Sequence, residues 1–180
     1  MNKSLEKHLK DHLRVVPDFP KKGIMFQDIF SLVEQPTLLK KIINEISKVV
    51  KKKKITKIVG IDARGFIFGS IVSNDNRIPF IPIRKKGKLP GPVHKMKYKL
   101  EYGYDQIELQ KSSIIREDRI MIIDDLIATG GTADAAGKLI KKITSKKITF
   151  MFVIDLYNLK GANILKKKGY NVYSIIKAEG

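Results

Sequence analysis

The sequence predicts an α/β fold, in which a mostly parallel twisted sheet is flanked by helices. Apolar segments of extended spacing alternate along the chain with segments of helical spacing, which is typical of such sheets. The buried strand predicted at 119–124 runs directly into two aspartates and then small residues, and these sheets bind ligands beyond the carboxyl ends of their strands. No repeat or linker divides the chain, so residues 1–180 are expected to form a single domain.

The elements of the first half follow from the spacing of apolar residues. Leu5, Leu9 and Leu13 recur every four residues and predict a short helix, and the turn-rich segment 18–28 has an apolar centre. Residues 36–50 carry a Leu, Ile and Val face behind a proline, which is favoured at the first helical position, and predict a longer helix. Strands are expected at 55–62 and 78–84, and a helix at 65–72.

In the second half, residues 85–105 carry Gly, Pro and Lys without periodicity and are predicted to form a long mobile loop. The remaining segments continue the alternation of strands and helices. Strands are expected at 106–110, 119–124, 148–155 and 170–176, and helices at 133–143 and 161–169.

The chain is strongly basic, with 36 Lys+Arg against 18 Asp+Glu and a net charge of +18. Only six of these cations are arginine, and the lysines are scattered through nearly every segment without interleaved aromatic residues. Proteins that bind nucleic acids favour arginine for bidentate contacts and aromatic rings for stacking. The pattern therefore favours solvated surface lysines, and no nucleic-acid partner is expected.

Cysteine is missing from the sequence, which excludes disulfides and thiolate metal sites. No apolar run approaches the roughly 20 residues of a membrane helix, and the first residues do not resemble a signal peptide. We therefore expect a cytoplasmic protein without a membrane partner. His8 and His12 lie four residues apart, but two nitrogens without a third ligand make a weak metal site, and we expect both at the surface.

The segment "IMIIDDLIATGGT" at 120–132 is the main functional signal. Small residues at 128–132 before a helix let backbone N–H groups approach an anion, and the helix start adds partial positive charge. Its glycines do not have the spacing of a Walker P-loop. Asp124 and Asp125 cannot bind phosphate but can accept hydrogen bonds from sugar hydroxyls. An acidic pair followed by an anion-binding turn fits a ribose that carries a 5-phosphate. The alternative is that the aspartates only cap a loop.

This segment resembles the phosphoribosyl pyrophosphate (PRPP) signature of the type I phosphoribosyltransferases. Four further blocks resemble the family members that use adenine, in order and at family spacing over about residues 15–175: "PDFPKKGIMFQDI", "IDARGFIFGS", "PIRKKGKLPGP" and "YKLEYGYDQIELQ". The resemblance implies that ribose 5-phosphate is transferred from PRPP to N9 of adenine, giving AMP and pyrophosphate in purine salvage. It also implies a homodimer, a hood at 1–35, a lid loop at 84–105, and Mg²⁺ that arrives with PRPP without direct protein ligands.

The resemblance assigns roles to the PRPP-binding residues. Asp124 and Asp125 would accept hydrogen bonds from the ribose hydroxyls. The 5-phosphate would be held by Ala128, Thr129, Gly130, Gly131 and Thr132. Pyrophosphate would be bound by Asp62, Ala63, Arg64, Arg84, Lys85 and Lys88, with a cis peptide bond between Asp62 and Ala63.

The remaining roles concern the base. Glu101 is the implied general acid toward N7 of adenine, Arg64 is a second catalytic candidate, and Tyr102 would line the lid. Adenine would bind Ile24, Met25 and Phe26, although an apolar triplet is also typical of a core hairpin. Gln27 stands where the family mostly has arginine, which leaves its role open.

Two other functions stay open at this stage. One is transfer to another purine, hypoxanthine or guanine, because base choice depends on backbone positions. The other is a regulator with the same fold that senses PRPP and binds nucleic acid, which the net charge of +18 keeps in consideration. Turnover with each base separates the three.

Overall fold

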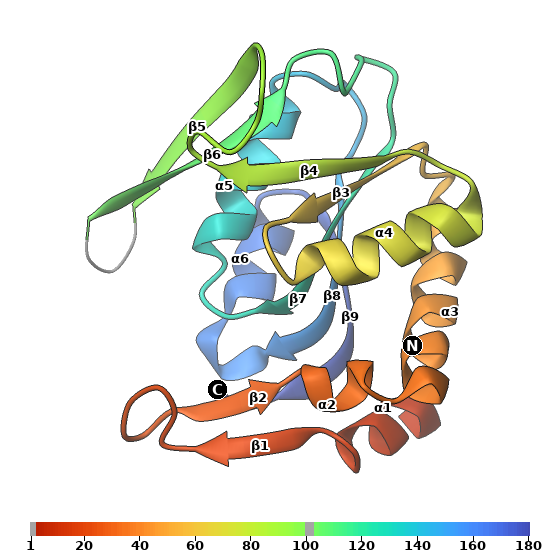
Figure 1. The fold of residues 1–180 in the computed structure, drawn as a ribbon, viewed down its shortest axis with the longest axis vertical. Coiled ribbons are helices and arrows are strands. Elements are labelled where there is room, and N and C mark those ends of the chain that lie inside the picture. Colours follow the sequence, from red (N-terminus) through yellow and green to blue (C-terminus); the bar gives the residue numbers. More distant parts are fainter. Residues whose placement is uncertain (1–2, 100–102) are drawn as a thin grey trace.

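A computed structural model describes residues 3–99 and 103–180 of the chain. Its main sheet has seven strands in the order β5-β6-β4-β3-β7-β8-β9 (Figure 1). Strands β4, β3, β7, β8 and β9 run parallel, and β6 pairs antiparallel with both β4 and β5. The strands are β3 (Lys57–Ile61), β4 (Phe80–Lys85), β5 (Val93–Lys99), β6 (Tyr104–Gln110), β7 (Ile120–Ile127), β8 (Thr149–Leu156) and β9 (Asn171–Ala178).

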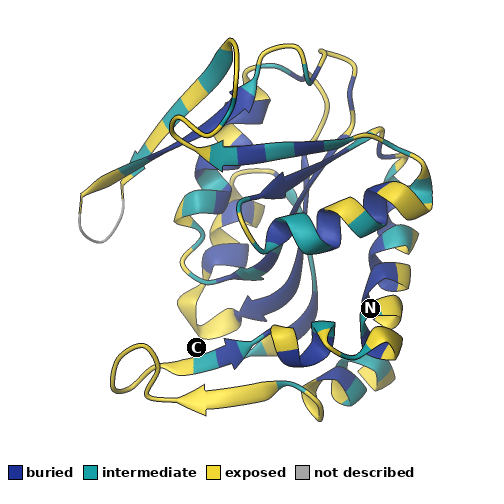
Figure 2. Cartoon of the chain, in the orientation of Figure 1, coloured by how far each residue is buried: buried dark blue, intermediate teal, exposed yellow. Residues whose placement is uncertain are grey.

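Helices cover both faces of this sheet and bury a hydrophobic cluster on each side. The first cluster lies beneath α1 (Lys3–Lys10), α2 (Phe30–Val33), α3 (Pro36–Lys53) and α4 (Gly65–Asn76). The second lies beneath α5 (Gly131–Lys141) and α6 (Gly161–Lys167), and the 3-10 turn η1 (Tyr157–Leu159) precedes α6. Every residue of β8 is buried, as expected for a parallel strand covered on both faces (Figure 2). Among the described residues, no helix combines the length and apolarity needed to cross a membrane.

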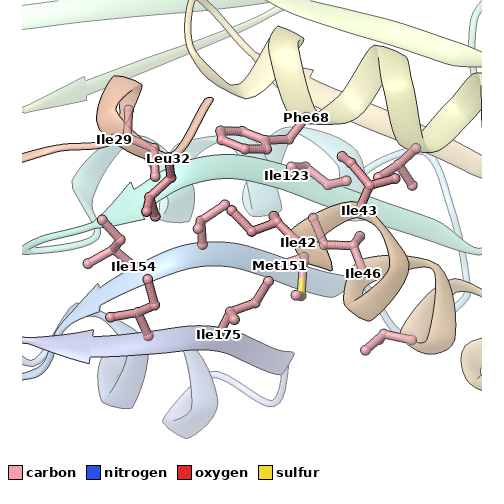
Figure 3. Packing of buried hydrophobic residues seen from close by; sticks show 14 of the residues in the cluster. Ile29, Leu32, Ile42, Ile43, Ile46, Phe68, Ile123, Met151, Ile154 and Ile175 are labelled. Atoms are coloured by element: carbon pink, nitrogen blue, oxygen red, sulfur yellow. The ribbon is translucent and has the colours of Figure 1, made fainter. Parts of the chain in front are cut away.

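A small hairpin outside the main sheet joins β1 (Arg14–Pro17) to β2 (Met25–Asp28). All four residues of β1 are exposed (Figure 2). Just after β2, the side chains of Ile29 and Leu32 are 1% and 0% exposed, and they pack in the same cluster as Ile154 of β8 (Figure 3). The hairpin is therefore anchored to the core of the sheet at its end and exposed along its length.

Most predicted helices and strands are present, with boundaries shifted by a few residues. The prediction of a loop without regular structure over 85–105 was wrong, because β5 occupies Val93–Lys99 and pairs with β6 along its whole length. Its burial alternates, since Met96 and Tyr98 are half-buried between exposed lysines. The sequence does alternate lysine with Met96 and Tyr98, but the Gly and Pro residues on either side favoured a loop.

Strand β7 is longer than predicted and continues to Ile127. Leu126 and Ile127 still pair with β8, opposite Ile154 and Asp155. Asp124 and Asp125 therefore lie within the last half of the strand, and the chain leaves the sheet only at Ala128.

Candidate active site

A cavity of about 280 Å³ lies at the carboxyl ends of the parallel strands. It is lined by the continuous segment 124–133 together with Arg64 and Lys99. The β1–β2 and β5–β6 hairpins both project on the side where β4 and β8 end (Figure 1). The fold thus brings the aspartate pair, the small-residue loop and Arg64 to one cavity, and their roles stay predictions.

The loop at 128–132 passes from the end of β7 into the first turn of α5. Gly130 has a φ of +85°, a left-handed conformation that glycine adopts without steric cost. Helix α5 begins at Gly131, so the N–H groups of its first turn have no intrahelical acceptors and are available to an anion. The loop has the conformation and the free donors of a phosphate-binding site.

Gly161, the first residue of α6, packs directly against this loop. Its N–H donates to the Ala128 carbonyl oxygen at 3.1 Å, and a Cβ at Gly161 would lie 2.2 Å from the same oxygen. The sequence did not predict a role for Gly161. The only signal was a glycine at the start of a helix, a position that does not by itself require one.

The acidic pair at the end of β7 is closely coupled. Asp125 N–H donates to Asp124 Oδ1 at 2.9 Å, and Arg64 Nε forms an ion pair with Asp125 Oδ2 at 2.6 Å. Burial raises the pKa of Asp124 well above its usual value, and the charge of Asp125 adds to the effect. Burial also raises the pKa of Asp125, while the Arg64 guanidinium opposes that shift. Both carboxylates lie within β7, before the loop at 128–132 begins.

The turn after β3 lies directly against this pair. The peptide bond between Asp62 and Ala63 is cis, as the resemblance implied. At Gly65, a Cβ would meet the Ile123 carbonyl oxygen at 2.5 Å and Asp124 Oδ1 at 3.2 Å. Only glycine therefore allows the turn to approach β7 closely enough to place Arg64 beside Asp125.

Of the predicted pyrophosphate cations, Arg64 lines the cavity, whereas Arg84, Lys85 and Lys88 do not. Arg84 Nε donates to Asp62 Oδ2 at 3.1 Å, and its Nη1 donates to the Lys88 carbonyl oxygen at 3.2 Å. Lys85 Nζ lies 3.3 Å from Asp105 Oδ2 of β6, and the Lys88 side chain is exposed. The structure thus joins Arg84 to the Asp62 turn and directs Lys85 toward the β5–β6 hairpin.

The three predicted adenine contacts lie on the separate hairpin. Ile24 and Met25 are 40% and 44% exposed, so they do not form a core hairpin. Phe26 is half-buried and packs edge-on against Phe19, with ring centroids 5.0 Å apart. None of these residues lines the cavity at 124–133, so they form a separate apolar surface.

Gln27, by contrast, is only 7% exposed. Its Nε2 donates to the Met25 carbonyl oxygen at 3.3 Å and to the Glu179 carbonyl oxygen at 3.0 Å. Gln27 thus connects β2 to the residue that follows β9. The sequence carries no signal for this contact, because its partner is 152 residues away.

Two predicted residues, Glu101 and Tyr102, lie outside the described residues. Lys99, just before them, lines the cavity and was not predicted as a site residue. The rings of His8 and His12 lie near each other at α1 and its end, tilted by 58° with centroids 4.8 Å apart, and His12 contacts the His8 carbonyl oxygen. Within residues 3–99 and 103–180, no group of three or more His, Cys, Asp or Glu could hold a metal ion.

Comparison with known proteins agrees with this geometry. Residues 30–179 match the model of the phosphoribosyl transferase domain family. An adenine phosphoribosyltransferase of Pelagibacter ubique is 47% identical over 173 residues, which cover 96% of this chain and 99% of the relative. Another from Nitrosomonas eutropha is 44% identical over 167 residues, covering 93% and 96%.

A solved structure shares the fold over nearly the whole chain. The adenine phosphoribosyltransferase of Saccharomyces cerevisiae, crystallised with an imino-altritol bisphosphate and adenine, has a TM-score of 0.87 and 36% identity. The match covers 97% of this chain and 99% of that one. By its sequence, its fold and the loop at the end of β7, this chain belongs to the adenine phosphoribosyltransferase family.

Proposed function

We propose that this protein transfers ribose 5-phosphate from PRPP to N9 of adenine, giving AMP and pyrophosphate. One observation carries the proposal: an aspartate pair and an anion-binding loop line the same cavity. The yeast relative was crystallised with adenine and a bisphosphate, which supports the same substrate classes here. Transfer to hypoxanthine or guanine is the alternative within the family.

The ribose end of PRPP would bind along the segment 124–132. The N–H groups and threonine hydroxyls of 128–132 hold the 5-phosphate as a fixed anchor, so that binding energy from this unreacting end orients the anomeric carbon. Asp124 and Asp125 accept hydrogen bonds from the ribose hydroxyls. Their negative potential also stabilises the oxocarbenium ion that develops as pyrophosphate leaves.

The leaving group would bind beside the Asp62–Ala63–Arg64 turn. Arg64 carries the fork of donors that suits a phosphate, and it is already in the cavity through its ion pair with Asp125. Arg84, Lys85 and Lys88 add positive charge from the end of β4 and the residues after it. Together these cations would offset the several negative charges of pyrophosphate.

Adenine would lie on the surface made by Ile24, Met25 and Phe26. Phe26 offers a ring for stacking on the purine, and backbone groups near Met25 would read its amino edge. Glu101 is proposed to donate a proton toward N7, and Tyr102 to line the lid. These two roles depend on the family resemblance.

Magnesium is proposed to arrive with PRPP. Mg²⁺ usually keeps several waters and binds through one or two carboxylates together with substrate phosphates. Asp124 and Asp125 line the same cavity and would hold the waters of such a metal at a distance, without binding it directly. When bound, the metal supplies charge neutralisation at the pyrophosphate group.

The decisive experiment measures pyrophosphate release from PRPP with adenine, guanine and hypoxanthine in parallel, with and without Mg²⁺. Turnover with adenine alone, dependent on Mg²⁺, supports the proposal. Preference for another base would replace adenine as the substrate. If no base is used, the regulator that senses PRPP becomes the better hypothesis. A homodimer and a cytoplasmic location stay predictions.

Glu101→Gln tests the proposed general acid. The change keeps the size of the side chain and removes its proton-donating carboxyl group, so kcat should fall by about 10²-fold or more while KM for adenine changes little. Steady-state kinetics with each substrate varied in turn would show this. Equal losses in kcat and in adenine affinity would identify Glu101 as a binding residue.

A further inference from the structure

A chain of polar contacts crosses from the phosphate loop to the base of the β5–β6 hairpin. Thr132 Oγ1 donates to Tyr98 Oη at 3.5 Å, the outer limit of a hydrogen bond. Tyr98 Oη donates to Asp105 Oδ2 at 3.2 Å, and Lys85 Nζ lies 3.3 Å from the same oxygen. The four residues come from α5, β5, β6 and β4.

The two central members of this chain are fixed by the sheet. Tyr98 and Asp105 stand directly opposite each other in the β5–β6 register, so their side chains lie on the same face. Gln106 N–H donates to Asp105 Oδ1 at 2.7 Å, which holds the carboxylate in place from the other side. Tyr98 is half-buried, on the inner face of the strand.

The protonation states of Tyr98 and Asp105 suit the hydrogen bonds that they make. The Gln106 N–H and the Lys85 ammonium lower the pKa of Asp105, against the opposing effect of burial, so the carboxylate is ionised and accepts. Burial raises the pKa of Tyr98, although the Thr132 hydroxyl opposes the shift, so the phenol keeps its proton and donates. Both groups therefore have the protonation that the contacts require at neutral pH.

We propose that Tyr98 and Asp105 are positioning residues, which hold the β5–β6 hairpin against the phosphate loop and thereby set the affinity for PRPP but not for adenine. This inference rests on the proposed function. Thr132 is a candidate ligand of the 5-phosphate, and Lys85 a candidate ligand of pyrophosphate. The Tyr98–Asp105 pair stands between these two ends of PRPP and contacts both residues.

The separation of the two substrate surfaces explains the selectivity. The Lys99 carbonyl oxygen lies 4.0 Å from the Cβ position of Gly131, so the end of β5 approaches the start of α5 closely. The apolar surface around Phe26 belongs to the β1–β2 hairpin, which is not part of the main sheet (Figure 1). Loss of the Tyr98 contacts should therefore affect the loop at 128–132 more than the apolar surface around Phe26.

Tyr98→Phe keeps the ring and removes the hydroxyl group. We expect KM for PRPP to rise about three- to tenfold, the loss that one or two net hydrogen bonds would give, while kcat and KM for adenine stay within about twofold. Asp105→Asn should give a similar increase. Because both changes break the same chain of contacts, the double variant should be no worse than the poorer single variant.

Tyr104→Phe is the matched control, since Tyr104 lies on the same hairpin but is 76% exposed. It should leave both KM values unchanged. Effects of Tyr98→Phe and Asp105→Asn that multiply in the double variant would overturn the proposal. So would equal increases in both KM values, because a loss of general structure would affect adenine as much as PRPP.

Direct binding separates this inference from the proposed function. Titration calorimetry with ribose 5-phosphate measures the phosphate site without any turnover. Weaker binding by Tyr98→Phe and Asp105→Asn, but not by Tyr104→Phe, would support the positioning role even if adenine proved not to be the substrate. Unchanged affinity in all three variants would reject the role whatever base the enzyme uses.

Discussion

Asp124 and Asp118 both lie at the sheet, yet their surroundings move the two pKa values in opposite directions. For Asp118, burial would raise the pKa, but donation from Ile115 N–H, the Lys57 ammonium and the Thr56 hydroxyl outweighs it and lowers the value. For Asp124, burial and the charge of Asp125 both raise it. The Asp118 carboxylate is thus paired within the fold, whereas the Asp124 carboxylate lies at the proposed site with a raised pKa.

This contrast predicts opposite effects on stability. The folded state binds the Asp124 proton more tightly than the unfolded state does, so its contribution to stability falls as pH rises through the raised pKa. At pH 7 the unfolded carboxyl is ionised, whereas the folded one must either hold its proton or bury a charge, and both destabilise the protein. Asp124→Asn should therefore raise Tm by a few degrees while kcat/KM falls about tenfold or more. Thermal unfolding over pH 5–8 would measure this, with the gain shrinking toward pH 5.

Asp118→Asn is the matched comparison. A carboxylate with a lowered pKa stabilises the fold above its unfolded value and loses this effect as pH falls, so the substitution should lower Tm at pH 7 and matter less in acid. If Asp124→Asn lowered Tm at pH 7 as much as Asp118→Asn does, the proposed cost of the buried site charge would be wrong.

At the scale of elements, the phosphate loop depends on close contact with the start of α6. Gly161→Ala would place a methyl group against the Ala128 carbonyl oxygen, where the available distance is 2.2 Å. Because that oxygen is a backbone atom, the loop at 128–132 would have to move. We therefore expect KM for PRPP to rise about tenfold and the free energy of unfolding to fall by about 1–3 kcal/mol. Asn163→Ala, at an exposed position of α6, should change neither quantity in kinetics or in thermal unfolding.

The position of the β1–β2 hairpin depends on a buried amide. Gln27→Glu would replace a donor with a carboxylate facing the carbonyl oxygens of Met25 and Glu179, and Gln27→Ala would remove the contact. We expect KM for adenine to rise about three- to tenfold with alanine, and more with glutamate, at nearly constant KM for PRPP. Steady-state kinetics would decide. A glutamate variant that binds adenine as well as the wild type would exclude a positioning role for the amide.

The same elements show what the sequence can predict. The aspartate pair and the loop at 128–132 were predictable, because all their functional groups lie within one short segment. Strand β5 was not, because its short alternation lies between segments rich in Gly and Pro, which favour a loop. Gly161 and Gln27 act through partners 33 and 152 residues away, and the spacing along a chain carries no information about such contacts.

At the scale of the whole molecule, two surface properties act against each other. A net charge of +18 repels a second copy of the chain at long range. Large apolar side chains are also exposed on and near the β1–β2 hairpin, including Val15, Phe19, Met25 and Phe30. Exposed apolar side chains gathered in one region are typical of surfaces that bind a partner.

If the expected homodimer buries such apolar residues, salt should favour it. The Debye length falls from about 30 Å at 0.01 M to about 8 Å at 0.15 M ionic strength, so repulsion between two cationic copies weakens while the apolar contact is retained. Analytical ultracentrifugation at these two ionic strengths should show the dimer fraction increasing with salt. A dimer that dissociates as salt is added would instead be held by ion pairs, and a monomer under both conditions would remove the homodimer from the proposal. Phe19→Ser, a polar change at a 51% exposed side chain, should weaken an apolar dimer without affecting the salt trend.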